Sequence, residues 1–137
     1  MDTSKEYIKI CVKTEEIQKL RKKWQWSDFY CETPIEWLNK GKSPSISVAL
    51  SINNKRYKNE TWLPRQDQLQ EMVDNKKPDE LIVRLINYLQ DNQKYYKNEA
   101  IKKLYPTNSM ERIWLAFVMK EKYNKIWNGK EWIKEIK

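Results

Sequence analysis

This chain of 137 residues contains no histidine, and that absence removes a large part of ordinary enzyme chemistry. Without imidazole there is no histidine general base, no serine–histidine–aspartate triad and no His-ligated zinc. The two glycines, Gly41 and Gly129, stand alone, so no glycine-rich loop is present to hold a phosphate or a dinucleotide. We therefore expect a protein that is not an enzyme and that uses no metal and no small-molecule cofactor.

Cysteine is equally scarce. Cys11 and Cys31 are too few and too far apart for a metal cluster or a disulfide framework, which favours a reducing compartment. No apolar run approaches the length of a membrane span, and residues 1–10 lack the apolar stretch of a signal peptide. These features predict a cytoplasmic location and no membrane partner.

The chain is instead rich in cations and aromatic rings. It has 27 Lys and Arg against 19 Asp and Glu, a net charge of +8, and 7 Trp and 8 Tyr. A chain of this length can bury a hydrophobic core without help from disulfides, so we predict one domain spanning 1–137. The basic residues are concentrated in 1–60 and 94–137, and a surface formed by both would attract a polyanion.

Alternating hydrophobicity predicts strands in the N-terminal half. In 6–13, apolar Ile8, Ile10 and Val12 alternate with other residues at the period of a half-buried strand. A further strand is predicted within 25–31.

The clearest strand signal is 45–52, which alternates between an apolar face and a face of Ser and Ala. The apolar face, which we expect to pack on the core, consists of Ile46, Val48, Leu50 and Ile52. Asn53-Asn54 then predicts a turn into a strand over 56–63, so that 45–63 forms an antiparallel hairpin.

Two short helices are predicted between these strands. Thr14 is suited to cap a helix that carries Ile17, Leu20 and Trp24 on one face. Further along, Thr33-Pro34-Ile35-Glu36 has the pattern of a capping box, and Gly41 ends the helix that follows.

From Arg65 onward the hydrophobic period becomes that of helices. One helix is predicted around Leu69, Met72 and Val73, a second begins after Pro78 and continues to Leu89, and a third covers 100–104. Ser109 is suited to cap a last helix over 110–125, whose run 113–119 is apolar on nearly every side and is expected at the centre of the core.

Near the C-terminus, Asn128-Gly129 favours either a tight hairpin between Trp127 and Trp132 or a helix C-cap at the glycine. The fold class predicted by the whole pattern is α+β, with a small antiparallel sheet in the N-terminal half and several helices in the C-terminal half.

Three segments place cations beside rings, a mixture that phosphate contacts and base stacking require. The candidate nucleic-acid or partner-binding residues in them are Lys19, Arg21, Lys22, Lys23, Trp26, Lys55, Arg56, Lys58, Lys94, Tyr95, Tyr96 and Lys97. The alternative interpretation is that these segments are ordinary solvated helix faces next to buried rings.

The tryptophans divide into two groups. Trp114, Trp127 and Trp132 are expected in the core or against the Asn-Gly turn. For Trp24, Trp26, Trp37 and Trp62 burial is also the expectation, and any of them left exposed would be an anchor for a partner.

Two pairs of acids stand four residues apart, Asp67 with Glu71 and Asp28 with Glu32. Either pair could hold a divalent metal or share a proton, but neither has a third acidic partner at a recognisable spacing. We therefore expect solvated carboxylates here. Cys11 is interpreted as a small buried residue of the first strand, and no base that would mark a nucleophile flanks Cys31.

Two stretches resemble short accessory proteins encoded by tailed phages and prophages of Gram-positive bacteria. They are Trp62-Leu63-Pro64-Arg65-Gln66-Asp67-Gln68-Leu69-Gln70-Glu71-Met72 and the segment 109–132. The resemblance implies a phage-borne gene expressed in a bacterial cytoplasm and supplies no catalytic residue.

Small phage proteins of this class often act by binding. We therefore expect an inhibitor of a host defence nucleoprotein, such as a CRISPR effector, whose basic aromatic surface competes for nucleic acid or for an acidic protein groove. Two alternatives stay open, a nucleic-acid-binding accessory protein acting alone and a small structural or assembly component of the virion.

Overall fold

The computed structural model describes residues 1–50, 54–73, 77–91 and 109–135. The chain divides into two compact units, an N-terminal unit of Asp2–Arg65 and a C-terminal unit of Gln66–Lys137 together with Met1. The prediction of one domain stays a prediction. Within the described ranges, no helix is long and apolar enough to cross a membrane.

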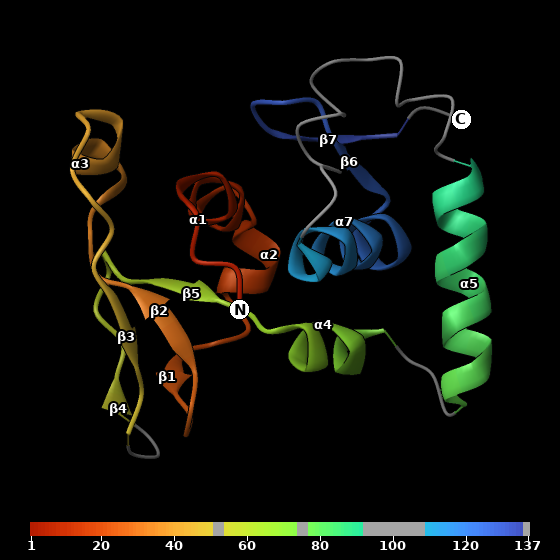
Figure 1. The fold of residues 1–137 in the computed structure, drawn as a ribbon, viewed down its shortest axis with the longest axis horizontal. Coiled ribbons are helices and arrows are strands. Elements are labelled where there is room, and N and C mark those ends of the chain that lie inside the picture. The colour runs from red at the N-terminus through yellow and green to blue at the C-terminus, as the bar shows by residue number, and fades with distance from the viewer. Residues whose placement is uncertain (51–53, 74–76, 92–108, 136–137) are drawn as a thin grey trace. The chain divides into compact units, whose positions relative to one another are not determined.

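The N-terminal unit combines short helices with antiparallel strands (Figure 1). Its elements are α1 (Lys5–Val12), α2 (Glu15–Gln18), β1 (Lys23–Trp24), β2 (Phe29–Cys31), α3 (Ile35–Asn39), β3 (Ile46–Val48), β4 (Asn54–Lys55) and β5 (Thr61–Leu63). Together with the helices of the C-terminal unit, they confirm the predicted α+β class.

The predicted strand over 6–13 is wrong, because this segment forms helix α1. Tyr7, Ile10 and Cys11 are spaced so that they also share one face of a helix, and all are buried. Ser4 caps the helix by accepting a hydrogen bond from the Tyr7 amide at 3.2 Å. The Tyr7 hydroxyl donates to the carbonyl oxygen of Pro64 at 2.6 Å, which ties α1 to the end of β5.

Strand β2 occupies the centre of a three-stranded antiparallel sheet in the order β3-β2-β5. Tyr30 stands opposite Ser47 on one side and opposite Trp62 on the other. The predicted hairpin of 45–63 is therefore wrong, since its two strands pair with β2 and not with each other. The predicted strand in 25–31 is confirmed over β2, whereas the turn residue Asn53 lies outside the described residues.

The predicted core face of the strand over 45–52 is wrong at Val48 and Leu50, which are exposed, while Ala49 between them is buried. Ile46 is half-buried, and Ile52 lies outside the described residues. Opposed residues of an antiparallel sheet share a face, so Ser47 lies on the face of Tyr30, against which the Trp24 ring stacks at 4.4 Å. On this face of the sheet, the small Ser47 side chain therefore lies beside the large rings of Tyr30 and Trp24.

The predicted caps of the two short helices are used for other contacts. Thr14 precedes α2, but its hydroxyl donates to the Ile10 carbonyl at 2.7 Å and does not cap. The Thr33 hydroxyl accepts from the Ser45 amide at 2.7 Å, which fixes the start of β3 instead of forming a capping box. Helix α2 ends at Gln18, so the predicted apolar face through Leu20 and Trp24 does not form.

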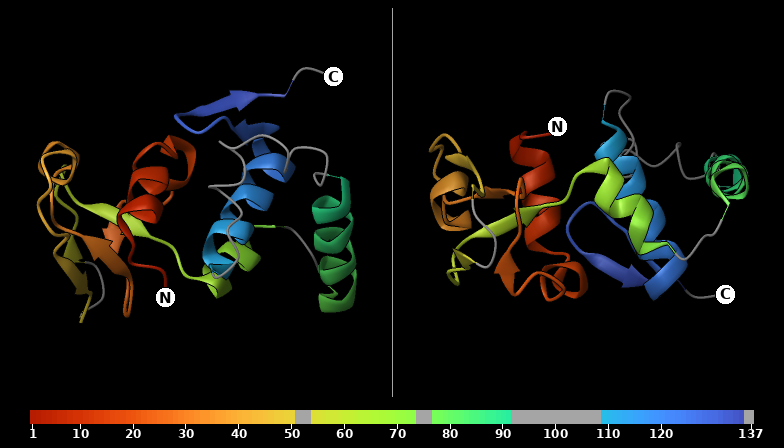
Figure 2. Two further views of the ribbon diagram at one scale, coloured as in Figure 1. Left: turned by 45° about the horizontal axis from the view of Figure 1, so that its top comes forward. Right: turned by 90° about the horizontal axis from the view of Figure 1, so that it is seen from below.

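The C-terminal unit is built around one helix. Its described elements are α4 (Gln66–Met72), α5 (Pro78–Asp91), α7 (Met110–Tyr123), β6 (Lys125–Trp127) and β7 (Trp132–Lys134). Helix α7 lies between α4 and the β6–β7 hairpin (Figures 1 and 2). The Ser109 side chain accepts from the Arg112 amide, and residues 114–119 are all buried, which confirms the predicted central helix. The helix predicted over 100–104 lies outside the described residues.

Further contacts of this unit join side chains of α5 and α7 and close the C-terminal hairpin. Arg84 and Glu121 form an ion pair at 2.6 Å. Trp127 and Trp132 stand opposite each other with ring centroids 5.3 Å apart, and Asn128 Oδ1 accepts two backbone amides in the connection. The hairpin interpretation is thus confirmed over the alternative of a C-cap at the glycine.

Candidate nucleic-acid interface

Two lysines stand directly opposite each other on the short ribbon that β1 and β4 form. Lys23 is the cross-strand partner of Lys55, and both side chains are exposed. Like charges opposed in a sheet destabilise the pairing. Strand pairing therefore gains nothing from this arrangement, and an anion placed between the two ammonium groups would relieve it.

More cations and two exposed rings lie next to this ribbon in the sequence. Lys19, Lys22 and Lys58 are exposed, and in the described ranges of this unit no lysine forms an ion pair. Trp26 and Tyr57 are each 62% exposed. The Lys55 ammonium lies 5.9 Å from the centroid of the Tyr57 ring, so cation and ring are neighbours. We call Lys19, Lys22, Lys23, Lys55, Lys58, Trp26 and Tyr57 the lysine ribbon.

Arg56 follows β4 but points into the unit. Its guanidinium donates to the carbonyl oxygens of Gln18 at 2.7 Å and Arg21 at 2.9 Å, and to Gln18 Oε1 and the Glu60 carbonyl. It also lies 5.2 Å from the centroid of the Trp24 ring. Burial lowers the pKa of Arg56, and the nearby Glu60 carboxylate opposes that shift. This side chain fastens three segments of the chain together.

Arg21 is occupied in the same way. Its Nε lies 3.1 Å from Oδ2 of Asp28, which is fully buried, and its guanidinium stacks 4.3 Å from the centroid of the Trp62 ring. The Asp28 carboxylate also accepts the Gln25 amide at 2.7 Å. Arg21 therefore holds the turn between β1 and β2 against β5.

The structure brings together some of the predicted site residues and separates others. Arg21 and Arg56 are engaged in contacts within the unit, next to β1 and β4. The predicted lysines of 19–58 and Trp26 face solvent. Lys94, Tyr95, Tyr96 and Lys97 lie outside the described residues. Tyr57 was not predicted as a site residue, although its position between Arg56 and Lys58 is a signal that could have found it.

The expectations for the four undetermined tryptophans are half right. Trp24 and Trp62 are buried as expected, but Trp26 and Trp37 are exposed, so burial was the wrong prediction for them. Trp26 lies in the turn between β1 and β2, which Arg21 and Asp28 hold. Trp114, Trp127 and Trp132 are buried as predicted.

The acid pairs do not form a site in the described structure. Asp28 is buried against Arg21, and Glu32 lies beyond the other end of β2, where its carboxylate accepts the Ser45 hydroxyl. Asp67 and Glu71 are exposed on α4. Across the ranges that the structure describes, no group of three or more Cys, Asp and Glu could hold a metal ion.

Both cysteines are free and buried. Cys11 lies in α1 and not in the predicted strand. Burial raises the pKa of the Cys31 thiol, an effect that hydrogen bonding by the backbone and side chain of Thr33 opposes. A buried thiol that holds its proton is a poor nucleophile.

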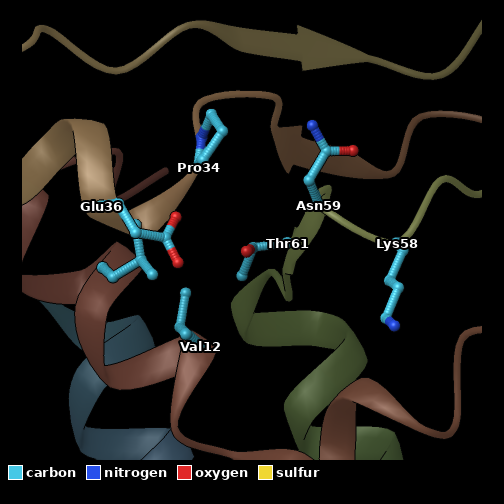
Figure 3. A pocket seen from close by; sticks show the side chains of 7 residues that line it. Val12, Pro34, Glu36, Lys58, Asn59 and Thr61 are labelled. Carbon is cyan, nitrogen blue, oxygen red and sulfur yellow. The ribbon is translucent and has the colours of Figure 1, made fainter.

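The N-terminal unit also contains a cavity beside Lys58. Its volume is about 520 Å³, and it opens between the end of α1, the start of α3 and the segment that leads into β5 (Figure 3). The lining residues are Val12, Pro34, Ile35, Glu36, Lys58, Asn59 and Thr61.

Comparisons of this chain with protein-family models, with curated proteins and with solved structures find no match. The assignment of a function therefore depends on the geometry described above.

Proposed function

We propose that this chain is a non-enzymatic binding protein whose lysine ribbon holds a nucleic-acid strand, and that it acts in a bacterial cytoplasm on a host defence nucleoprotein such as a CRISPR effector. The single observation that carries the proposal is the opposition of Lys23 and Lys55 across β1 and β4. A protein that keeps two like charges in register without an internal counterion leaves both available to an external anion.

The exposed rings favour nucleic acid over a simple anion. Single strands are bound by combining cations that follow the phosphates with aromatic side chains on which bases stack. Trp26 and Tyr57 present large exposed rings near the lysines, and neither is needed to fill the core of the unit. Stacking of one base contributes about 1–3 kcal/mol in such sites.

The choice of a nucleoprotein as the target rests on the resemblance of the C-terminal half to phage accessory proteins. Competition for a guide or target strand would let a small protein without catalytic residues block a much larger complex. A nucleic-acid-binding protein acting alone and a virion component are the alternatives, and the experiment separates them.

The test compares two doubly charge-reversed variants. Lys23→Glu/Lys55→Glu changes the ribbon, whereas Lys40→Glu/Lys42→Glu changes two exposed lysines at and after the end of α3 and serves as the matched control. We expect the ribbon variant to lose at least about tenfold in affinity for a single-stranded oligonucleotide at low salt, and the control to lose much less. Equal losses in the two variants would contradict a localised site.

A pull-down from lysate of the native host, with and without nuclease, then identifies the target class. A protein complex retained by the wild type after nuclease treatment and lost by the ribbon variant supports the nucleoprotein. Loss of all captured material on nuclease treatment supports an accessory protein acting alone on nucleic acid. Capture of virion proteins in both variants contradicts the proposal.

A further inference from the structure

The cavity beside Lys58 has the size and the lining of a small-ligand site. Its volume of about 520 Å³ lies in the ordinary range for such sites, and Val12, Pro34 and Ile35 give it apolar walls. Figure 3 shows Glu36 on one side of the opening and Asn59 and Lys58 on the other, with Thr61 between them.

The polar groups of this cavity are available to a ligand. Among the described residues, Glu36, Lys58 and Asn59 have no hydrogen-bond or ion-pair partner for their side chains. The neighbouring Glu60 is different, because its carboxylate already accepts the amide of Tyr57 at 2.7 Å. The unit therefore uses one carboxylate of this region internally and leaves the other facing the cavity.

We propose that this cavity binds a guanine base. An ionised carboxylate only accepts hydrogen bonds and has two oxygens to do so. Guanine is the one common base with two adjacent donors, N1–H and the N2 amino group, on its Watson–Crick edge, and Glu36 can accept both. The Asn59 amide can donate to guanine O6, and the apolar walls contact the faces of the base.

Lys58 connects this cavity with the lysine ribbon, since it belongs to both. A phosphate bound by the Lys58 ammonium brings its own base to the mouth of the cavity. The guanine can come from two sources, an unpaired guanine in a bound strand or a free guanine nucleotide. For the first source, the inference rests on the proposed function. In either case the base is recognised through its Watson–Crick edge, as flipped-out and single-stranded bases are.

The first experiment titrates the full chain with the four nucleoside monophosphates and follows the backbone amides of Asn59 and Thr61 by NMR. We expect guanosine monophosphate to bind about tenfold or more tightly than adenosine monophosphate, the discrimination typical of a bidentate contact. Glu36→Gln should abolish the preference. Glu15→Gln, which removes another exposed carboxylate, from the first turn of α2, should keep it. An equal response to all four nucleotides overturns the proposal.

The second experiment separates the two sources of guanine. A short oligothymidine with one central guanine should bind more tightly than oligothymidine, and the difference should disappear in Glu36→Gln. If both oligonucleotides bind equally and guanosine monophosphate leaves the two amides unmoved, the guanine site is wrong and the lysine ribbon stands. If guanosine monophosphate binds and neither oligonucleotide does, the cavity takes free nucleotides and the proposed function fails.

Discussion

The arginines and the lysines of the N-terminal unit carry the same charge but occupy opposite places. Arg21, Arg56 and Arg65 all donate to or pair with groups of their own unit, and Arg65 reaches the Ser27 carbonyl at 2.6 Å. Across the described ranges of the N-terminal unit, the lysines form no ion pair, and all but Lys5 are exposed. The difference shows that a segment rich in arginine and lysine does not form one basic surface. The arginines form an inner layer that stabilises the unit, and the lysines form an outer layer that is exposed to solvent.

The chemistry of the two side chains explains this division. A guanidinium has five donors in a plane, so one Arg56 satisfies several carbonyl oxygens while its face packs near Trp24. An ammonium is compact and strongly hydrated, and burying it without an acceptor is costly. The arginines of the unit therefore hydrogen-bond its loops to one another, whereas the lysines stay solvated and can bind an anion.

The largest expected effect lies in the C-terminal unit and gives the scale for the others. Phe117 is fully buried in α7 and contacts the rings of Tyr88 and Trp114. Phe117→Ala should lower the free energy of unfolding by about 3–5 kcal/mol, because it removes apolar contacts and leaves a cavity. Urea denaturation followed by tryptophan fluorescence measures the change. A loss below about 1 kcal/mol would contradict a central position for α7.

The next effect tests the inner layer. Arg56→Lys keeps the positive charge but cannot reach the acceptors on Gln18, Arg21 and Glu60 together, so unfolding should become easier by about 2 kcal/mol. Lys55→Arg, the reverse exchange one residue earlier, should change stability by less than about 0.5 kcal/mol. Thermal melting of the two variants compares them. Equal melting temperatures would remove the distinction between the layers.

How far the sequence predicted these features depends on how local their causes are. Helix α7 was predicted because its cap at Ser109 and its continuous apolar run are neighbours in the chain. The face of β3 was not, because it depends on the stack of Trp24 on Tyr30, which a strand pattern does not contain. In α1, alternation and helical spacing coincide, and the cap at Ser4 decides between them.

The site divides in the same way. The lysines and Trp26 of the lysine ribbon were predictable by residue type, since lysines beside aromatic residues are visible in the sequence. The contacts of Arg21 and Arg56 inside the unit were not predictable, because their acceptors and rings come from distant segments of the chain. Arg21 and Trp62, for example, are 41 residues apart in sequence numbering. The cavity was missed as well, since Glu36 and Asn59 come to line one cavity only after α3 and the segment before β5 have folded.

A smaller effect distinguishes lysines that touch phosphates from lysines that merely raise the net charge. Lys23→Gln/Lys55→Gln should make the logarithm of the oligonucleotide affinity less dependent on the logarithm of salt concentration, by about 1.4 in slope for two lost contacts to a single strand. Lys40→Gln/Lys42→Gln removes the same net charge and should leave the slope nearly unchanged. Fluorescence anisotropy between low and moderate salt gives both slopes, and matching slopes would argue for diffuse attraction to the whole protein.

The smallest expected effect is a gain in stability that accompanies a loss of binding. Lys23→Glu alone converts the opposed lysines into a Lys–Glu pair across β1 and β4, and favourable cross-strand pairs contribute about 0.2–1 kcal/mol. We therefore expect the single variant to be slightly more stable than the wild type while it binds a nucleic-acid strand more weakly. Lys22→Glu, at the exposed neighbour that precedes β1, should weaken binding without the gain in stability. Urea denaturation and anisotropy on the same samples test the two signs together. If Lys23→Glu destabilised the unit, the two lysines would not repel each other in the folded protein, and the reason for expecting an anion between them would be lost.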